Sequence, residues 1–100
     1  SLYRLLPHIQ RLQTKSAARF PAPHKWLWSK TLLEQASDSF VAAYTASLYP
    51  ANVPVLELCC GAGSDSLSLA RDTNRCMTSI DRSPLACALT RANLRSHGCR

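Results

Sequence analysis

The chain has 100 residues, of which 46% are hydrophobic and 18% charged, and its net charge at pH 7 is +6. This length allows one small domain, and the composition is that of a folded protein and excludes a disordered one. The longest apolar stretch, Val53 to Cys60, is interrupted by Pro54 and Glu57. A membrane-spanning helix needs roughly 20 mostly apolar residues, so we predict no membrane association.

The positive charge is concentrated near the N-terminus. Residues 1–33 contain six Lys and Arg residues and no acid, whereas six basic and six acidic residues cancel from Glu34 onward. A polyanion such as RNA is the partner that this segment favours, because contacts with phosphates release counterions. A solvated basic helix face explains the charges equally well, and both interpretations stay open.

The five cysteines are an odd number and form no C-x-x-C pair. This spacing fits neither a zinc site nor a disulfide framework, so we predict no metal site. A free cysteine in a protein core behaves as a small hydrophobic residue, and thiols persist in reducing compartments. We therefore expect a cytoplasmic protein.

The first half of the chain, residues 1–52, is predicted to be a basic helical region. Leucines and an isoleucine recur at helical spacing between Leu2 and Leu12, and the continuous helix is expected to begin near Pro7. After a loop at residues 20–23, Ser29 is expected to cap a short helix that ends at Gln35. Asp38 is expected to cap a second helix, with one face formed by Phe40, Val41, Tyr44 and Leu48.

The second half, residues 53–100, changes to alternating strands and helices. We predict a buried strand at residues 53–60, a helix that begins at Ser64 or Asp65, and a second strand at residues 76–80. Ser83 is then a predicted N-cap for a helix with Pro84 at its first position. The expected apolar face of this last helix consists of Leu85, Ala88, Leu89 and Ala92.

This order predicts an α/β fold with a parallel sheet and right-handed crossovers. Parallel sheets need both faces covered, so two strands do not form a complete sheet. The chain ends at Arg100, about where a third strand is expected to begin. We therefore expect residues 53–100 to be the first half of a Rossmann-like domain.

A candidate ligand site lies where the first predicted strand ends. Gly61 and Gly63 allow the backbone to turn sharply and to approach a ligand, and Asp81 follows the second strand twenty residues after Gly61. A carboxylate at that place accepts hydrogen bonds from ribose hydroxyls. Glu57 and Asp65 beside the turn would repel a pyrophosphate and favour a cationic ligand.

Other interpretations of the same residues remain. Asp65 also fits a simple helix cap, and Asp81 fits an ordinary turn. A dinucleotide-binding oxidoreductase is an alternative, although Ser66 matches the third glycine of its fingerprint only in part. A non-catalytic nucleic-acid-binding module is another, but it leaves the glycines and Asp81 unexplained.

The segment from Val55 to Leu67, with its sequence E-L-C-C-G-A-G-S-D-S, resembles the first motif of class I S-adenosylmethionine-dependent methyltransferases. Its Cys-Cys-Gly-x-Gly-x-Asp form is similar to that of bacterial methyltransferases of the THUMP-like subgroup. Residues 79–84 resemble the second motif of the class, and residues 28–37 resemble the segment that precedes the first strand. The resemblance covers roughly residues 25 to 98 and is most specific at the glycines.

This resemblance implies S-adenosylmethionine as cofactor and methyl transfer as the reaction, with RNA as the favoured acceptor. Glu57 would hold the methionine amino group, directly or through water, and Asp81 would bind the ribose hydroxyls. Gly61, Ala62 and Gly63 would line the methionine moiety, and Arg82 would flank the adenine. The catalytic residues are expected beyond Arg100, so none is assigned.

Overall fold

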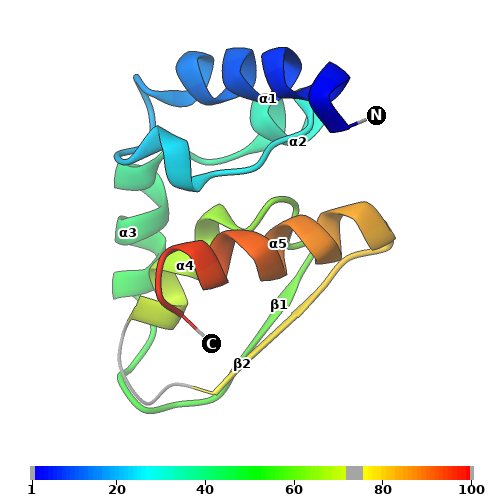
Figure 1. Ribbon diagram of the computed structural model, residues 1–100. Coiled ribbons are helices and arrows are strands. Elements are labelled where there is room, and N and C mark those ends of the chain that lie inside the picture. The colour runs from blue at the N-terminus through cyan, green and yellow to red at the C-terminus, as the bar shows by residue number, and fades with distance from the viewer. Residues whose placement is uncertain (1, 72–75, 100) are drawn as a thin grey trace.

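The computed structural model describes residues 2–71 and 76–99 (Figure 1). Along the chain the elements are α1 (Leu2–Ser16), the 3-10 helix η1 (Pro23–Lys25), α2 (Lys30–Gln35), α3 (Ser39–Ser47), β1 (Val55–Leu58), α4 (Ser64–Arg71), β2 (Met77–Ile80) and α5 (Pro84–Ser96). The predicted mixture of helices and strands with a parallel strand pair is confirmed. Within the described residues, no helix has both the length and the apolar character required to cross a membrane.

The predicted helix caps are confirmed atom by atom. The side chain of Ser29 accepts a hydrogen bond from the backbone N–H of Leu32, and Asp38 caps α3 in the same way. At α5, Ser83 caps the helix and Pro84 occupies its first turn. Each side-chain oxygen satisfies an amide that has no partner within its helix, which fixes where the helix begins.

The predicted start of α1 near Pro7 is wrong. The helix begins at Leu2, and Pro7 lies inside it. Proline removes one backbone hydrogen bond and crowds the preceding turn, but here that turn is close to the helix end and Leu5, Leu6 and Pro7 itself are exposed. A small local distortion at an exposed helix end disturbs no packed neighbour.

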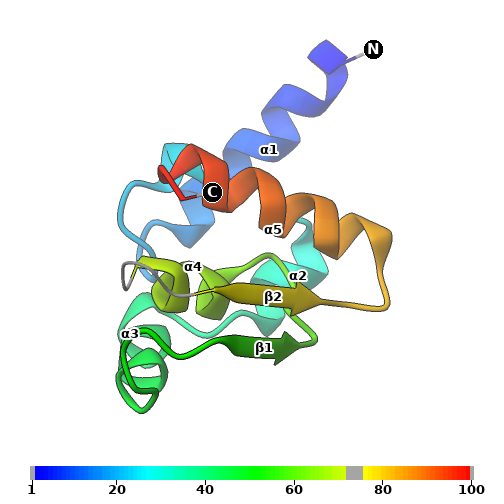
Figure 2. The same cartoon turned by 90° about the horizontal axis from the view of Figure 1, so that it is seen from below.

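The two strands pair in parallel register, with Val55 opposite Met77 and Glu57 opposite Ser79. Figures 1 and 2 show α4 and α5 on one side of this pair. The expectation of a buried strand at residues 53–60 is wrong, because Leu56 is 62% exposed and Leu58 is 63% exposed. Alternate side chains of a strand point to opposite faces, and among the described residues only one face is covered.

The expected apolar faces of α3 and α5 are also corrected. On α3 the buried residues are Ala42 and Ala46, while Phe40 is 86% exposed. On α5 they are Ala86, Thr90 and Asn93, and all four residues of the predicted face are less buried than these three. Small and polar side chains face inward on both helices because the helices approach their neighbours closely, which larger apolar side chains would prevent.

The core joins the two halves of the sequence. Its main cluster contains Leu12, Phe20, Trp26, Trp28 and Leu33 from the first half, packed with Ala62 and Leu67 from the second. The two tryptophan rings stack at a centroid distance of 4.8 Å, and Phe20 lies against both. The boundary between a helical region at residues 1–52 and a second region at residues 53–100 stays a prediction. Residues from both regions contribute to this one hydrophobic cluster.

Candidate functional site

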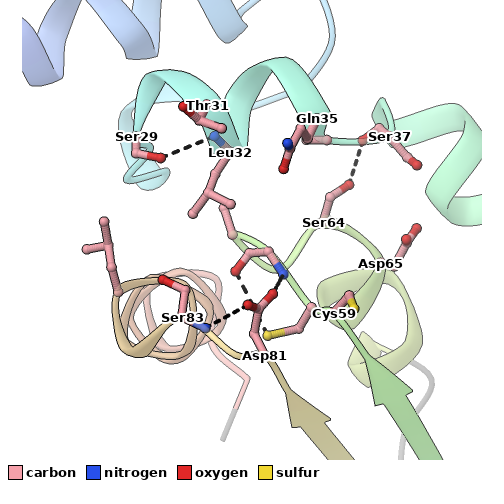
Figure 3. A pocket seen from close by; sticks show the side chains of 15 residues that line it. Ser29, Thr31, Leu32, Gln35, Ser37, Cys59, Ser64, Asp65, Asp81 and Ser83 are labelled. Atoms are coloured by element: carbon pink, nitrogen blue, oxygen red, sulfur yellow. Dashed lines mark hydrogen bonds between the residues drawn. The ribbon is translucent and has the colours of Figure 1, made fainter.

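A pocket of about 630 Å³ lies at the carboxyl ends of the two parallel strands (Figure 3). One wall is the loop after β1, Cys59 to Gly63, which we call the glycine turn. The opposite wall comes from α2 and the loop that follows it. The lining residues, which define the glycine-turn pocket, are Ser29, Thr31, Leu32, Gln35, Ala36, Ser37, Cys59, Cys60, Gly61, Ala62, Ser64, Asp65, Asp81, Ser83 and Leu85.

The two glycines of the turn have different structural roles. Gly61 has a φ of +59°, and an added Cβ would meet only the Cδ2 atom of Leu32, at 3.9 Å. Gly63 has a φ of +98°, and its Cβ would lie 3.2 Å from both backbone and side-chain atoms of Thr90. Gly61 is therefore favoured by its backbone conformation, whereas Gly63 in addition lets α5 pack closely against the turn.

The cysteines beside the glycines also differ. Cys60 is buried, as expected of a packing residue, and burial raises the pKa of its thiol. Cys59 is exposed, lines the pocket and has a φ of +60°, a left-handed conformation that is uncommon outside glycine. Of the two, only Cys60 packs inside the protein as a small hydrophobic residue.

Asp81 connects the end of β2 to the glycine turn. Its Oδ2 atom accepts a hydrogen bond of 3.0 Å from the backbone N–H of Gly61, and its Oδ1 atom accepts one of 2.9 Å from Ser83. These N–H groups, Ser83 first and Gly61 second, lower the pKa of Asp81. Each carboxylate oxygen has a second lone pair, so Asp81 can hold the turn and still accept two hydrogen bonds from a ligand.

Glu57 lies beneath the pocket, on the covered face of β1. Its Oε2 atom accepts a hydrogen bond of 2.6 Å from the hydroxyl of Ser66, which lies 2.9 Å from the hydroxyl of Ser79. Burial raises the pKa of Glu57, the Ser66 hydrogen bond opposes that shift, and the charge of Asp65 adds to it. Two neighbouring carboxylates are thus held in a setting that disfavours their charged forms.

Asp65 stands in the first turn of α4 and lines the pocket. Burial raises its pKa, and its Oδ1 atom is buried with no hydrogen-bond partner among the described residues. A buried acceptor without a partner is costly, so a ligand that brings a hydrogen-bond donor to this atom gains binding free energy.

The α2 wall is the part of the site that sequence reasoning missed. The sequence of residues 28–37 only resembles the segment that precedes the first strand in the methyltransferase class. It predicts no ligand role for Thr31, Leu32 or Gln35. Hydrogen bonds from two side chains hold the end of α2 and the loop after it. Arg19 donates to the carbonyls of Leu33 and Ala36, and the Ser64 hydroxyl donates one hydrogen bond of 2.7 Å to the carbonyl of Ser37. Arg19 therefore supports the pocket wall, although its charge alone suggested a contact with RNA.

The structure brings most of the predicted cofactor-binding residues together. Gly61, Ala62, Asp65 and Asp81 line the pocket. Three others do not line it: Glu57 accepts a hydrogen bond from Ser66, Gly63 lies close to Thr90, and Arg82 is exposed. Their roles toward a ligand stay predictions.

Comparisons of the chain with models of protein families, with curated proteins and with solved structures gave no match.

Proposed function

We propose that the glycine-turn pocket binds S-adenosylmethionine and that the protein transfers its methyl group to an acceptor. The observation that carries this proposal is the meeting of Gly61, Asp65 and Asp81 in one pocket at the carboxyl ends of two parallel strands. Ligands of α/β sheets bind at this edge, and a volume of about 630 Å³ suits a ligand of nucleoside size.

The charge of the pocket supports this cofactor over a dinucleotide. Asp65 lies in the first turn of α4, where a pyrophosphate would otherwise bind the helix N-terminus. A carboxylate there repels phosphate oxygens and attracts the ammonium group and the sulfonium of S-adenosylmethionine. Asp65 Oδ1 lacks a hydrogen-bond partner within residues 2–71 and 76–99, and an ammonium group supplies three donors.

The same proposal extends to the fold. We infer that β1, α4, β2 and α5 belong to a Rossmann-like methyltransferase domain, and that further structure covers Leu56, Leu58 and Ile80. These side chains form an exposed apolar face on a parallel strand pair, and parallel sheets are normally covered on both faces.

In the proposed reaction the bound cofactor supplies an electrophilic methyl group. Asp81 would hold the ribose while it keeps the glycine turn in place, and Asp65, with Glu57 behind it, would orient the ammonium end. The α2 wall, with Thr31 and Gln35, would exclude water from one side of the ligand. Catalysis by such a site rests on positioning the methyl group in line with an acceptor.

We predict that the affinity for S-adenosylhomocysteine rises with pH. The pKa values of Glu57 and Asp65 are raised from 4.5 and 3.8, so both groups retain protons above those values in the free protein. An ammonium group binds the deprotonated forms, and affinity therefore increases as pH rises through the raised pKa values. Calorimetric titrations of the full-length protein at several pH values, from the lowest at which it stays folded, measure this slope.

The control ligand is 5′-methylthioadenosine, which has the same nucleoside as S-adenosylhomocysteine but lacks the α-amino group of its amino-acid part. Its affinity should change little over the same pH range, because the pKa of Asp81 is lowered and this group stays ionised. The Asp65→Asn variant should also flatten the slope for S-adenosylhomocysteine. Equal slopes for the two ligands would contradict the assignment of these acids to the ammonium group.

A further inference from the structure

The glycine turn is held from behind by a side chain of α5. The hydroxyl of Thr90 donates a hydrogen bond of 2.9 Å to the carbonyl oxygen of Gly61. The same hydroxyl lies 3.3 Å from the Sγ atom of Cys60, but sulfur is the weaker acceptor for its single proton. Thr90 is buried and does not line the glycine-turn pocket, so the Gly61 carbonyl points away from the pocket.

The conformation of the turn sets the direction of the next N–H group. Gly63 N–H donates a hydrogen bond of 3.0 Å to the carbonyl of Cys60, and Gly61 has a positive φ whereas Ala62 does not. These features define a type II′ turn with the Gly61–Ala62 peptide at its centre. In a trans peptide the C=O and N–H bonds point in opposite directions. Since the Gly61 carbonyl faces Thr90, the Ala62 N–H faces the pocket.

The Ala62 N–H group is a donor without a partner. Ala62 is buried and lines the pocket, and its amide has no hydrogen-bond partner within residues 2–71 and 76–99. A buried donor of this kind is costly, so a ligand that brings an acceptor to it gains binding free energy. Three residues further along the chain, Asp65 Oδ1 is a buried acceptor that also lacks a partner among the same residues. The two groups together match a ligand end that offers both an acceptor and a donor.

We propose that Thr90 is a positioning residue that holds the Ala62 N–H toward the α-carboxylate of the ligand's amino-acid end. The ammonium and carboxylate groups of an amino acid share one carbon atom, so Asp65 and the nearby Ala62 N–H can bind one group each. Of the described residues that line the pocket, none is Lys, Arg or His, so a neutral donor must meet this carboxylate. This inference rests on the proposed cofactor and names the part of it that the turn recognises.

Two restraints keep the central peptide of the turn in this orientation. Reversal of the peptide would give a type I′ turn, which requires a positive φ at Ala62, and alanine resists that conformation. Reversal would also break the hydrogen bond from Thr90. Without the hydroxyl, the Gly61 carbonyl would lack a partner behind the turn, and rotation toward the pocket would bring it back to water. Thr90 therefore opposes a reversal that only the φ of Ala62 would otherwise prevent.

The test compares two ligands of the full-length protein by calorimetry: S-adenosylhomocysteine and its decarboxylated analogue, which keeps the amino group and the nucleoside. Wild type should bind the parent ligand about tenfold more tightly. In Thr90→Val, which keeps the shape of the side chain but removes the hydroxyl, this preference should fall to about threefold or less, whereas Thr90→Ser should retain it. The matched control Thr14→Val makes the same change at an exposed position of α1 and should keep the wild-type preference.

The Ala62→Gly background removes the other restraint. Glycine adopts a positive φ readily, so Thr90 alone would hold the peptide in Ala62→Gly, and the preference should stay near about tenfold. In the double variant with Thr90→Val neither restraint remains, and the preference should disappear. Both proteins of this pair lack the Ala62 methyl group, so the lost packing is common to them and cancels in the comparison.

Hydrogen exchange of the Ala62 amide tests the turn without any ligand. Within residues 1–100, only one of the three glycines, Gly61, precedes an alanine, so carbonyl-labelled glycine combined with nitrogen-labelled alanine selects this amide in NMR spectra. Because it faces an open pocket without a partner, it should exchange faster than the amides of Gly61 and Gly63, which both donate hydrogen bonds.

An Ala62 amide as protected as that of Gly63 would overturn the proposal whether or not the cofactor binds. Equal weakening of both ligands by Thr90→Val would assign Thr90 to the stability of the turn alone and would also refute it. A wild-type protein that binds both ligands equally would retain the proposed cofactor but exclude the carboxylate contact. A protein that binds neither ligand, although its Ala62 amide exchanges rapidly, would refute the cofactor and with it the carboxylate as occupant.

Discussion

Replacement of Asp81 by Ala is expected to weaken the binding of S-adenosylhomocysteine by more than about tenfold. The carboxylate is proposed to accept hydrogen bonds from the ribose hydroxyls through lone pairs that Gly61 and Ser83 leave free. In Asp81→Ala the ligand loses these acceptors, and the glycine turn also loses the group that holds the Gly61 N–H. Calorimetry of wild type and variant measures the combined loss.

A ligand without ribose hydroxyls separates the two contributions. In wild type, the 2′,3′-dideoxy analogue of S-adenosylhomocysteine should bind at least about tenfold more weakly than the parent ligand. In Asp81→Ala the two ligands should bind almost equally, because the hydroxyls have lost their common partner. If Asp81 only orders the turn, the variant will weaken both ligands by the same factor, and the ribose assignment is then wrong.

The Asp81→Asn variant should have an intermediate affinity. Its amide oxygen can replace one carboxylate oxygen, but its NH₂ group must face either the Gly61 N–H or the Ser83 N–H. Two donors that face each other displace the side chain or the backbone. We therefore expect both a loss of affinity and a lower melting temperature, in contrast to a residue that contacts the ligand alone.

The largest expected effect on stability comes from Asn93→Ala. The Asn93 side chain is fully buried and accepts a hydrogen bond of 2.7 Å from the N–H of Leu27. It donates hydrogen bonds to the carbonyls of Leu27, at 2.9 Å, and of Ala62, at 2.8 Å. Each buried group left without a partner costs about 1–3 kcal/mol, so the variant should lose about 3 kcal/mol or more of its free energy of unfolding.

Urea denaturation measures this loss, and Arg91→Ala on the exposed side of the same helix is the control, with an expected change within about 0.5 kcal/mol. Asn93→Asp retains the acceptor for Leu27 but directs a carboxylate oxygen at two carbonyl oxygens, so it should be at least as destabilising. A loss below about 1 kcal/mol for Asn93→Ala would show that this side chain does not join the first half of the chain to the glycine turn.

The features that sequence predicted well are local. Ser29, Asp38 and Ser83 act on amides three residues away, so their spacing alone indicates where each helix begins. The parallel strand pair likewise follows from a strand, a helix and a second strand in succession. The meeting of Gly61 with Asp81 could be predicted because parallel strands place their carboxyl ends at one edge.

The features that sequence did not predict depend on distant residues. The apolar run at Leu56 and Leu58 is the same whether a strand is covered on one face or on two, and only the three-dimensional packing decides between them. The charge of Arg19 suggested a contact with RNA or a solvated helix face, but its guanidinium reaches carbonyls 14 and 17 residues further along the chain. The α2 wall of the pocket could not be predicted for the same reason. No motif in residues 29–37 indicates that they lie opposite the glycine turn.

The most direct test of the central proposal is a calorimetric titration of the full-length protein with S-adenosylhomocysteine and with NAD, combined with alkylation of its cysteines. We predict one site that binds S-adenosylhomocysteine at least about tenfold more tightly than NAD. The bound ligand should protect Cys59, which lines the pocket, but not the exposed Cys76, which does not. Tighter binding of NAD, or S-adenosylhomocysteine binding that leaves Cys59 as reactive as before, would contradict the proposed cofactor site.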